Sequence, residues 1–405
     1  MEETMMYRFI DCNTPQDHDA FVTKHDLCNL LQSSDWARVK DNWQHAYTAV
    51  LVEEKMVAAA LVLIKPLPLG YTMMYIPKGP VMDYEDKALV AFYLNALKKW
   101  AKKKKCLFIT FDPALKLREF KLDQKDMPYD EKVVEAIDAL KKNGAIFKGF
   151  TKSIKDTIQP RFHMGLYYSD HWEESIPKST MKSVRKAINK RVEVEEVGME
   201  GLEEFARIMH LTEERKSVHL RDQAYFKKLL EVYKDHAHIF LAKVDPAKRE
   251  QELNLKIAEI NEKMKDEKLK EKGQRKLQED MRKATEELSS IQEVKKVCDK
   301  ETIIACGLMI GYGNYVEMLY AGMDENFKAF RPQYLIYLKQ FELAFQQGYQ
   351  FVTMGGVEGT LDDGLSVFKS NFDPTVVEYV GEFDVPVKSM LYKMAKLFQK
   401  LRTGK

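Results

Sequence analysis

The chain has 405 residues, of which 45% are hydrophobic and 31% charged, and its formal net charge at pH 7 is +2. This length is too great for one ordinary hydrophobic core, so two or three folded units are expected. The composition is that of a globular soluble protein. The small net charge does not imply nucleic-acid binding by itself, so any such contact must come from local patches of cations.

The cysteines and the apolar runs restrict the cellular context. Five cysteines without CxxC spacing are scattered along the chain: Cys12, Cys28, Cys106, Cys298 and Cys306. This pattern argues against a structural zinc site and a disulfide framework, and it suits a reducing cytosol. The longest apolar run, Met56–Ile64, is far too short to span a bilayer, and the acidic start of the chain is unlike a signal peptide. We therefore expect a cytoplasmic protein whose membrane contact is at most peripheral, at the inner face of the cell membrane.

The first third of the chain alternates between helix and strand signals. A helical stretch is expected over residues 21–45, with Ser33 and Ser34 among the residues able to cap a helix before Trp36. Period-two and apolar runs predict strands at Ala46–Glu53, Lys55–Ile64, Tyr71–Ile76 and Cys106–Phe111. Amphipathic patterns predict helices at Ala88–Lys103 and Val133–Lys142. This order indicates an α/β unit with a mixed sheet.

A second pass of similar order follows. Helices are expected at Lys182–Lys190, Leu202–Arg215, Asp222–Tyr233 and Pro332–Gln347. Strands are expected at Arg191–Glu196, Ala237–Val244, Thr302–Tyr312, Asn314–Ala321 and Phe351–Met354. Two units of similar order suggest a duplicated fold.

A charged insertion interrupts the second pass. Its apolar residues step by three and four along two segments: Leu253, Ile257, Ile260, Met264, and then Leu277, Met281, Ala284, Leu288, Ile291. This spacing predicts an antiparallel two-helix coiled-coil arm over residues 245–298, with its bend near Gly273. Acidic and basic residues nearly balance along it, so a solvated arm is the default interpretation, and phosphate binding by the lysines near the tip is the alternative.

A glycine-rich loop follows the last expected strand. Gly355 and Gly356 allow close approach of the backbone to a ligand or another chain segment. Leu365, Phe368 and Phe372 then recur at helical spacing, which predicts a short helix with one buried face and Lys369 at the edge of that face. On composition alone, a glycine turn and a solvated lysine explain this stretch.

The order of several short motifs favours a functional interpretation of this stretch instead. Leu31–Trp36, Leu319–Met323, Gly355–Val357 and Phe368–Phe372, with the lysine-rich insertion before the last three, resemble the Fem family of aminoacyltransferases from about Asn29 to Phe383. These enzymes move an amino acid from aminoacyl-tRNA onto peptidoglycan precursors. The resemblance implies an α/β protein of two tandem GNAT-like (acetyltransferase-like) units. We expect the first at 1–153, with 384–405 packing back on it, and the second at 154–244 and 299–383.

The resemblance also implies roles for individual residues. Lys369 matches a lysine beside the reacting centre, and Gly355 and Gly356 belong to the loop next to it. Tyr320, Arg221 and Lys40 match residues that contact the precursor or its phosphates, with Arg215 competing for the place of Arg221. Asp112 is the candidate acceptor of the amine proton. From the residues alone, each of these has a structural interpretation instead: a surface lysine, a polar loop, a buried tyrosine or a turn.

The expected chemistry is the attack of an amine on an ester that is already activated. Such a reaction needs cations, hydrogen-bond donors and a carboxylate, and it implies no metal, coenzyme A or other cofactor. The chain contains no GxSxG, HExxH or Walker motif.

A basic helix is the candidate contact for tRNA. Lys182, Arg185, Lys186 and Lys190 cover one broad side of the stretch that begins near Lys178. Similar helices occur here in the family, which often has a glycine before the next strand where this chain has Arg191. A second basic run, Lys98–Lys105, is suited equally to tRNA, anionic lipid or solvent.

The sequence therefore predicts a tRNA-dependent transfer of alanine or serine to the stem-peptide lysine of lipid II, with the UDP-linked precursor left open as acceptor. One alternative is a coenzyme A-dependent N-acyltransferase. The chain lacks the [QR]xxGx[GA] loop of such enzymes, which argues against this alternative. The other is a non-enzymatic adaptor of cell-wall synthesis that recruits partners through the arm. The sequence leaves the oligomeric state open.

Overall fold

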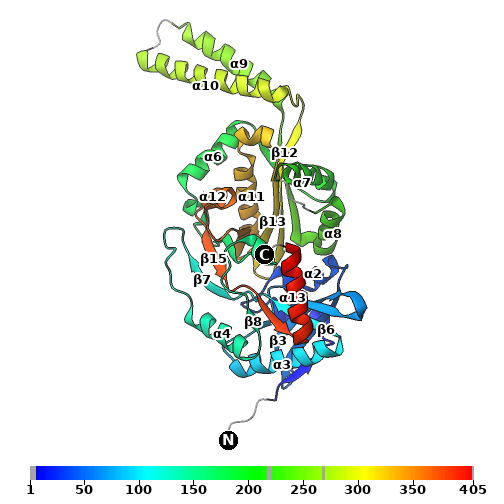
Figure 1. The fold of residues 1–405 in the computed structure, drawn as a ribbon. Coiled ribbons are helices and arrows are strands. Elements are labelled where there is room, and N and C mark those ends of the chain that lie inside the picture. Colours follow the sequence, from blue (N-terminus) through cyan, green and yellow to red (C-terminus); the bar gives the residue numbers. More distant parts are fainter. Residues whose placement is uncertain (1–5, 217–220, 267–269, 404–405) are drawn as a thin grey trace.

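The computed structural model describes residues 6–216, 221–266 and 270–403, which form two mixed sheets, flanking helices and a projecting arm (Figure 1). The first sheet runs in the order β1-β2-β3-β4-β6-β16-β8, with β5 beside β3. Its strands are β1 (Arg8–Ile10), β2 (Gln44–Val52), β3 (Lys55–Pro66), β4 (Thr72–Ile76), β5 (Val81–Met82), β6 (Cys106–Phe111), β8 (Ile146–Phe147) and β16 (Phe383–Pro386). The β4–β6 pair is parallel, as expected for strands joined by a crossover helix.

The second sheet runs in the order β10-β11-β12-β13-β14-β9-β15-β7. Its strands are β7 (Lys116–Phe120), β9 (Phe162–Tyr167), β10 (Glu193–Val197), β11 (Ala237–Val244), β12 (Thr302–Tyr312), β13 (Tyr315–Met323), β14 (Phe351–Val357) and β15 (Thr375–Tyr379). Here β13 and β14 form the parallel pair. Each sheet thus contains an antiparallel meander that leads into one parallel pair.

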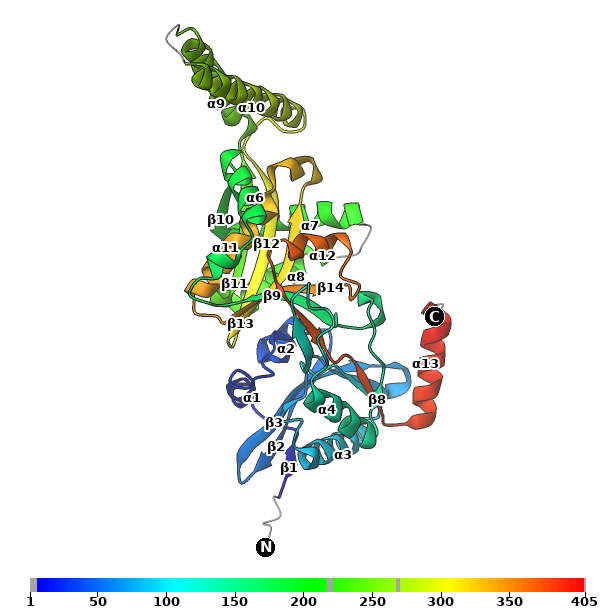
Figure 2. The ribbon, with the colours of Figure 1, turned by 90° about the vertical axis from the view of Figure 1, so that its left-hand side faces the viewer.

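Helices cover the faces of both sheets (Figure 2). The α-helices are α1 (Pro15–Val22), α2 (Ser34–Val39), α3 (Lys87–Lys103), α4 (Glu131–Lys142), α5 (Trp172–Ser175), α6 (Lys178–Asn189), α7 (Leu202–Lys216), α8 (Gln223–Tyr233), α9 (Pro246–Met264), α10 (Glu271–Lys295), α11 (Pro332–Gln346), α12 (Gly364–Ser370) and α13 (Ser389–Thr403). Six short 3-10 turns lie between them: η1 (Leu30–Gln32), η2 (Pro68–Gly70), η3 (Ile154–Asp156), η4 (Met199–Gly201), η5 (Lys234–His236) and η6 (Glu325–Phe330). Among the described residues, no helix is both long and apolar enough to cross a membrane.

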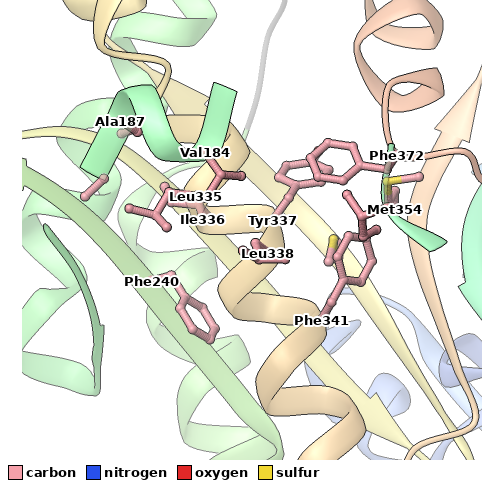
Figure 3. Close-up of a cluster of buried hydrophobic side chains, with 14 of the residues drawn as sticks. Val184, Ala187, Phe240, Leu335, Ile336, Tyr337, Leu338, Phe341, Met354 and Phe372 are labelled. Carbon is pink, nitrogen blue, oxygen red and sulfur yellow. The ribbon is translucent and has the colours of Figure 1, made fainter. Parts of the chain in front are cut away.

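The core of the second unit forms around α11. Ile336 and Phe341 are fully buried, and they lie with Val184 of α6 and Phe372 beyond α12 in one apolar cluster (Figure 3). The rings of Tyr337 and Phe372 stack with their centroids 5.5 Å apart. This packing fixes α12, and with it Lys369, against α11.

Two exchanged strands join the units. β7, from the first part of the chain, pairs with β15 in the second sheet, and β16, from near the end of the chain, pairs with β6 and β8 in the first. Lys396 of α13 forms an ion pair with Asp384 of β16 at 2.8 Å. The polypeptide therefore crosses between the units several times.

The arm is a helical hairpin in which α9 and α10 lie side by side and project from the second unit (Figure 1). Leu253, Ile260, Ala284 and Ile291 of the expected seam are buried. Gly273 lies in the first turn of α10, which begins at Glu271, whereas α9 ends at Met264; residues 267–269 between the two helices lie outside the described residues.

Most predicted elements are confirmed with boundaries shifted by a few residues, but residues 21–45 were wrongly expected to be helical. In that stretch the structure has only the end of α1, η1, the two-turn α2 and the start of β2. Ser33 ends η1 and caps α2 by accepting a hydrogen bond from the Trp36 amide at 3.0 Å, so the polar residues there break the segment rather than begin one long helix. The sequence analysis did not identify β7, β9, β15 and β16.

Candidate functional site

A cluster of buried charges lies between the two sheets. We call it the buried charge centre: Lys78, which follows β4; Asp112, which follows β6; Glu317 on β13; and Lys369 on α12. Lys78 and Asp112 follow neighbouring parallel strands, and this adjacency brings them together. The Lys78 Nζ lies 3.3 Å from Asp112 Oδ2, and both side chains are less than 5% exposed.

Asp112 is held from several sides. Its Oδ1 accepts hydrogen bonds from the Tyr75 hydroxyl at 2.8 Å and from the Lys78 amide at 3.2 Å. Burial raises the pKa of Asp112, while the Lys78 cation and the Tyr75 hydroxyl oppose that shift. The Lys78 Nζ also lies 4.4 Å from the centre of the Tyr379 ring. Asp112 and Lys78 therefore form a fixed ion pair.

Lys369 is buried, not at the edge of the buried helix face as the sequence predicted. Asp363 caps α12 by accepting from the Leu365 amide at 2.8 Å. The Lys369 Nζ donates to the carbonyl oxygens of Gly355 at 3.2 Å and Gly356 at 3.0 Å. The side chain turns inward because two exposed main-chain carbonyls of the glycine loop accept its protons. The sequence-predicted lysine and glycines thus meet in one place.

The strands beside Lys369 separate. β13 and β14 pair at three positions, ending with Glu317 opposite Thr353, and β14 then changes register at Thr353–Gly356. Gly355 has a φ of +80°, which a residue with a Cβ rarely adopts. A Cβ added there would lie 3.8 Å from both Glu317 Oε1 and Lys369 Nζ. Glu317 and Lys369 therefore flank the glycine loop at the end of the paired segment.

Burial also changes the proton affinity of this centre. It raises the pKa of Glu317 to about 7, although the Lys78 and Lys369 cations lower it. The Nδ1 of His163, on β9, lies 4.0 Å from Glu317 Oε1 and 3.3 Å from Thr353 Oγ1. Burial and the same two cations hold the pKa of His163 well below its usual range, so this imidazole is neutral at pH 7.

A second polar cluster lies at the end of α2. Lys40 follows this helix, and its Nζ lies 4.8 Å from the Trp36 ring centre and 5.5 Å from that of Tyr225. Burial and the neighbouring Arg221 lower the pKa of Lys40 to about 8. Arg221 lies over the other side of this cluster, 5.1 Å from the Tyr225 ring centre. Two cations held together without a carboxylate between them are typical of an anion site.

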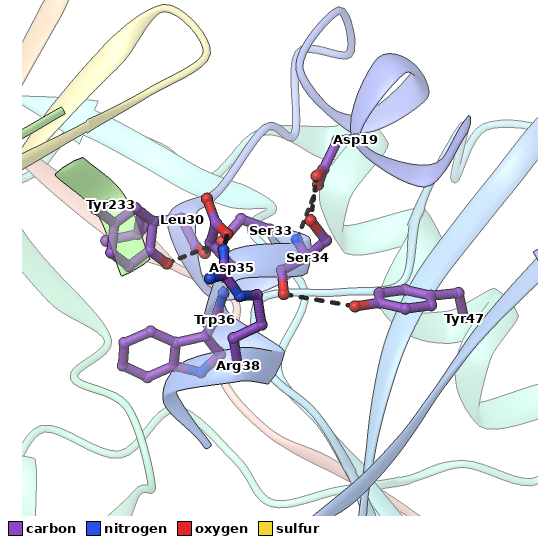
Figure 4. Close-up of polar contacts among 9 residues, drawn as sticks. All are labelled: Asp19, Leu30, Ser33, Ser34, Asp35, Trp36, Arg38, Tyr47 and Tyr233. Carbon is purple, nitrogen blue, oxygen red and sulfur yellow. Dashed lines mark hydrogen bonds and ion pairs between the residues drawn. The ribbon is translucent and has the colours of Figure 1, made fainter. Parts of the chain in front are cut away.

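Contacts within the first unit, and one with the second, hold α2 in place (Figure 4). The Ser33 and Tyr233 hydroxyls are 2.9 Å apart, and Asp19 Oδ1 accepts from the Ser34 amide at 2.8 Å. The Tyr47 hydroxyl reaches the Ser34 carbonyl at 3.4 Å. These contacts fix the end of α2 and therefore the position of Lys40.

Tyr320 joins this second cluster. Its ring meets Phe226 edge-on with the centroids 5.0 Å apart, and its hydroxyl interacts with Tyr225 and Arg221. Arg221, Tyr225 and Tyr320 line a cavity of about 940 Å³ with residues of α7, which include the carboxylates Glu203, Glu204 and Glu213. Arg215 does not belong to this cavity: its Nη1 bonds Glu325 Oε2 at 3.0 Å. Of the two competing arginines, Arg221 is therefore the one beside Lys40 and Tyr320.

A larger cavity of about 1160 Å³ lies between α6, the base of the arm, α11 and α12. Six cations line it: Lys186, Lys190, Arg215, Lys283, Lys328 and Arg331. Its apolar wall includes Ala321 of β13, Tyr337 of α11 and Phe368, the neighbour of Lys369. Three carboxylates also line it, Glu286, Glu287 and Glu325, so cations are in excess, and the cavity approaches the place where β13 and β14 separate.

The four cations predicted for α6 divide into two groups. Lys182, Arg185 and Lys186 are exposed. Lys190 is partly buried, with its Nζ 5.0 Å from the Phe330 ring centre, and burial lowers its pKa. Arg191 has a φ of +60° and pairs with Glu252 of the arm at 3.0 Å. It thus takes the left-handed conformation that a glycine at this place would favour.

Within the described residues, no group of three or more His, Cys, Asp or Glu side chains is arranged to hold a metal ion. The five cysteines are all unpaired.

Comparison with known proteins identifies the family. The model of the FemAB family matches residues 13–400. The chain belongs to the FemAB family. A protein named lipid II:glycine glycyltransferase from Staphylococcus aureus (strain USA300) is 30% identical over 94% of this chain and 93% of its own. The relative of the same name from strain COL matches at the same identity and coverage.

The solved structure of FemX agrees with this assignment. The crystal structure of FemX superposes with a TM-score of 0.76 at 27% identity, covering 96% of this chain and 99% of that one. A tandem GNAT protein from the clavulanic acid biosynthesis pathway matches at 9% identity with a TM-score of 0.48, over 94% of this chain and 99% of that one. The FemAB protein described here has two tandem GNAT-like units, as the resemblance implied. It is an aminoacyltransferase by family.

Sequence reasoning missed Lys78, Glu317 and His163. Lys78 lies in the Pro77–Pro80 turn, where no periodic pattern or motif marks it. Glu317 had a readable signal, because it is the one charged residue in the apolar run Tyr315–Tyr320. A lone carboxylate in a buried strand is expensive unless it has a role or a partner. Only the pairing of distant strands brings these three side chains together.

Proposed function

We propose that this FemAB protein transfers a small amino acid, alanine or serine, from aminoacyl-tRNA to the stem-peptide lysine of lipid II. The observation that carries the proposal is that a buried cation, Lys369, and a partly buried carboxylate, Glu317, lie near the same point of the glycine loop, close to a cavity with six cations in its lining. A relative named for a lipid II glycyltransfer supports the acceptor class. The transfer extends the bridge between peptidoglycan stem peptides.

Each cavity suits one substrate. Lys40 and Arg221 present two cations beside Tyr320, which suits the phosphates of a muramyl precursor. The larger cavity is lined by six cations and opens beside the exposed cations of α6, which suits the 3′ end of a tRNA. In this arrangement the acceptor amine and the ester meet at the glycine loop of Gly355 and Gly356.

The reaction places clear demands on the chain's residues. The amine must lose a proton before it attacks the ester carbonyl, and the sequence-based prediction for the proton acceptor is Asp112. The carbonyl oxygen gains negative charge as the C–N bond forms. The Lys369 ammonium, held by two carbonyls in a site only 3% exposed, supplies a fixed positive charge for that oxygen.

A membrane-facing edge of the first unit suits a lipid-linked acceptor. Four apolar side chains there are strongly exposed: Leu69 in the β3–β4 turn and Met390, Met394 and Leu397 on α13. The Lys388 Nζ lies 4.6 Å from the Tyr71 ring centre and links the turn to α13, which stands on the outside of the molecule (Figure 2). Apolar side chains among lysines favour an anionic bilayer surface. Met390→Glu should weaken sedimentation with vesicles containing phosphatidylglycerol, and Leu255→Glu on the arm should not; equal binding of both variants contradicts this edge.

An in vitro assay tests the proposal as a whole. Purified protein is incubated with separately charged glycyl-, alanyl- and seryl-tRNA, and with either lipid II or the UDP-linked pentapeptide as acceptor. We expect a mass increase of one alanine or serine residue on the lysine of lipid II. A gain of glycine corrects the donor, a gain only on the UDP-linked precursor corrects the acceptor, and no gain with any pair contradicts the function.

A further inference from the structure

We propose that Glu317 is the base that takes the proton from the attacking amine. The inference rests on the aminoacyl transfer proposed above and assigns to its site a catalytic residue. It gives Asp112 a different task, that of holding Lys78 in place.

The position of Glu317 carries the argument. It is the last residue of β13 that pairs with β14, so its side chain lies where the two strands begin to separate. Its carboxylate and the Lys369 ammonium lie near the same point of the glycine loop, each 3.8 Å from a Cβ placed on Gly355. A base and an oxyanion-stabilising cation must flank the reacting carbon in this way.

The accessibility of the two carboxylates differs. The Glu317 side chain is 15% exposed, whereas the Asp112 side chain is 3% exposed. Asp112 Oδ1 already accepts two hydrogen bonds, and Oδ2 faces the Lys78 ammonium. A carboxylate in a buried ion pair accepts a proton less readily, because protonation removes its attraction to the cation. Glu317 is therefore the better placed of the two to meet a substrate and to accept its proton.

The surroundings of Glu317 are consistent with a group that changes protonation during turnover. Lys78 faces it from the turn after β4, Lys369 from α12, and the neutral His163 from β9. The hydroxyls of Tyr315 and Tyr379 complete the environment. Burial raises the Glu317 pKa and the cations lower it, and the result is a pKa of about 7. At neutral pH such a carboxylate is partly deprotonated and basic enough to accept a proton.

The proton balance closes without any further reactant. The substrate ammonium gives one proton to the Glu317 carboxylate, and the neutral amine attacks the ester carbon as the C–N bond forms. When the C–O bond to the ribose breaks, the leaving oxygen takes a second proton from the same nitrogen. The products are an amide and a free tRNA hydroxyl, and the proton on Glu317 passes to solvent.

The test compares Glu317→Gln with Asp112→Asn and with the control Glu342→Gln, a partly exposed glutamate on the outer part of α11. Turnover and the Michaelis constants for both substrates are measured from pH 5.5 to 8.5, and thermal unfolding checks the fold. General-base catalysis typically contributes about 10²–10⁴-fold. We expect Glu317→Gln to lower turnover by roughly a hundredfold or more, to remove the inflection near pH 7 and to leave both Michaelis constants nearly unchanged. The control should behave as wild type.

Two results overturn the inference. One is a Glu317→Gln variant that keeps both wild-type turnover and the inflection. The other is an Asp112→Asn variant that folds, loses turnover and loses the inflection while Glu317→Gln retains it, because Asp112 would then be the base. If the wild-type protein transfers no amino acid from any charged tRNA, the proposed function fails instead, and that result is separate from both.

Discussion

The two parallel strand pairs of the molecule differ in one respect. In the first unit, β4 pairs with β6 from Thr72 opposite Cys106 to Ile76 opposite Phe111. In the second, β13 pairs with β14 only from Tyr315 to Glu317. We call the β4–β6 pair the closed pair, and it ends in a fixed ion pair between Lys78 and Asp112. We call the β13–β14 pair the open pair, and it ends beside a glycine loop with two charged residues, Glu317 and Lys369.

We infer from this difference that the two GNAT-like units have separate tasks. The closed pair supplies a rigid support whose charges satisfy each other. In the proposed reaction, the charges of the open pair face the two substrates. A fold that is duplicated can thus keep one copy as a scaffold and use the other for chemistry, since the site depends on where strand pairing stops rather than on the fold itself.

The largest expected loss of stability comes from breaking the closed pair. Lys78→Met removes the cation beside Asp112 and leaves a buried carboxylate without its ion partner. Such a loss typically costs about 3 kcal/mol or more. We expect the free energy of unfolding in urea at pH 7 to fall by about that amount. Lys87→Met, which breaks an exposed pair with Glu135, is the control and should change little. Equal losses in the two variants would mean that the closed pair is not a support.

A smaller loss of stability is expected from a change at the glycine loop beside the open pair. Gly355→Ala places a Cβ on a residue with a φ of +80°, 3.4 Å from the Met318 carbonyl oxygen. The strain costs roughly 1–2 kcal/mol. Gly348→Ala is a matched control, because Gly348 has a φ of +88° and open space around it. We expect similar melting temperatures for the two variants but reduced aminoacyl transfer only in Gly355→Ala. Equal activity in both variants would separate the glycine loop from the reaction.

The smallest effect concerns the exposed basic surfaces of the two units. Replacing Lys182, Arg185 and Lys186 by Gln should weaken tRNA binding at low salt and reduce its salt dependence, since fewer counterions are released. The matched variant replaces Lys98, Lys99 and Lys102 on α3 of the first unit, which are also exposed. Titrations at several salt concentrations distinguish them. A reduced salt slope in the α3 variant alone would move tRNA to the first unit.

Local patterns predicted most helices and strands, because the periods of α3, α11 and β12 follow from their own residues. The Fem motifs predicted the tandem units and named Lys369, Lys40, Arg221 and Tyr320. The buried charge centre was harder to predict. Lys369 looked like a surface lysine because its acceptors are main-chain carbonyls, which no side-chain pattern reveals.

Long-range strand exchange set the other limit on prediction. β7 and β15 pair although more than 250 residues separate them, and β16 returns to the first sheet from near the end of the chain. Short strands of this kind have little periodicity of their own. The contact of Lys78 with Asp112 follows from the pairing of β4 and β6, and the exchanged strand β15 brings Tyr379 against Lys78, so no local motif reveals either contact.

The central claim is that chemistry takes place at the open pair, with Lys369 stabilising the charge that develops there. Lys369→Met keeps the length of the side chain and removes the cation, and losing one such contact typically costs about 3 kcal/mol, roughly a hundredfold in rate. The deciding measurement is turnover at saturating acceptor, made together with acceptor affinity in the same variant. We predict turnover reduced roughly a hundredfold or more, with nearly unchanged affinity for tRNA and for the acceptor. Wild-type turnover at saturation, with or without weaker acceptor binding, would contradict the claim.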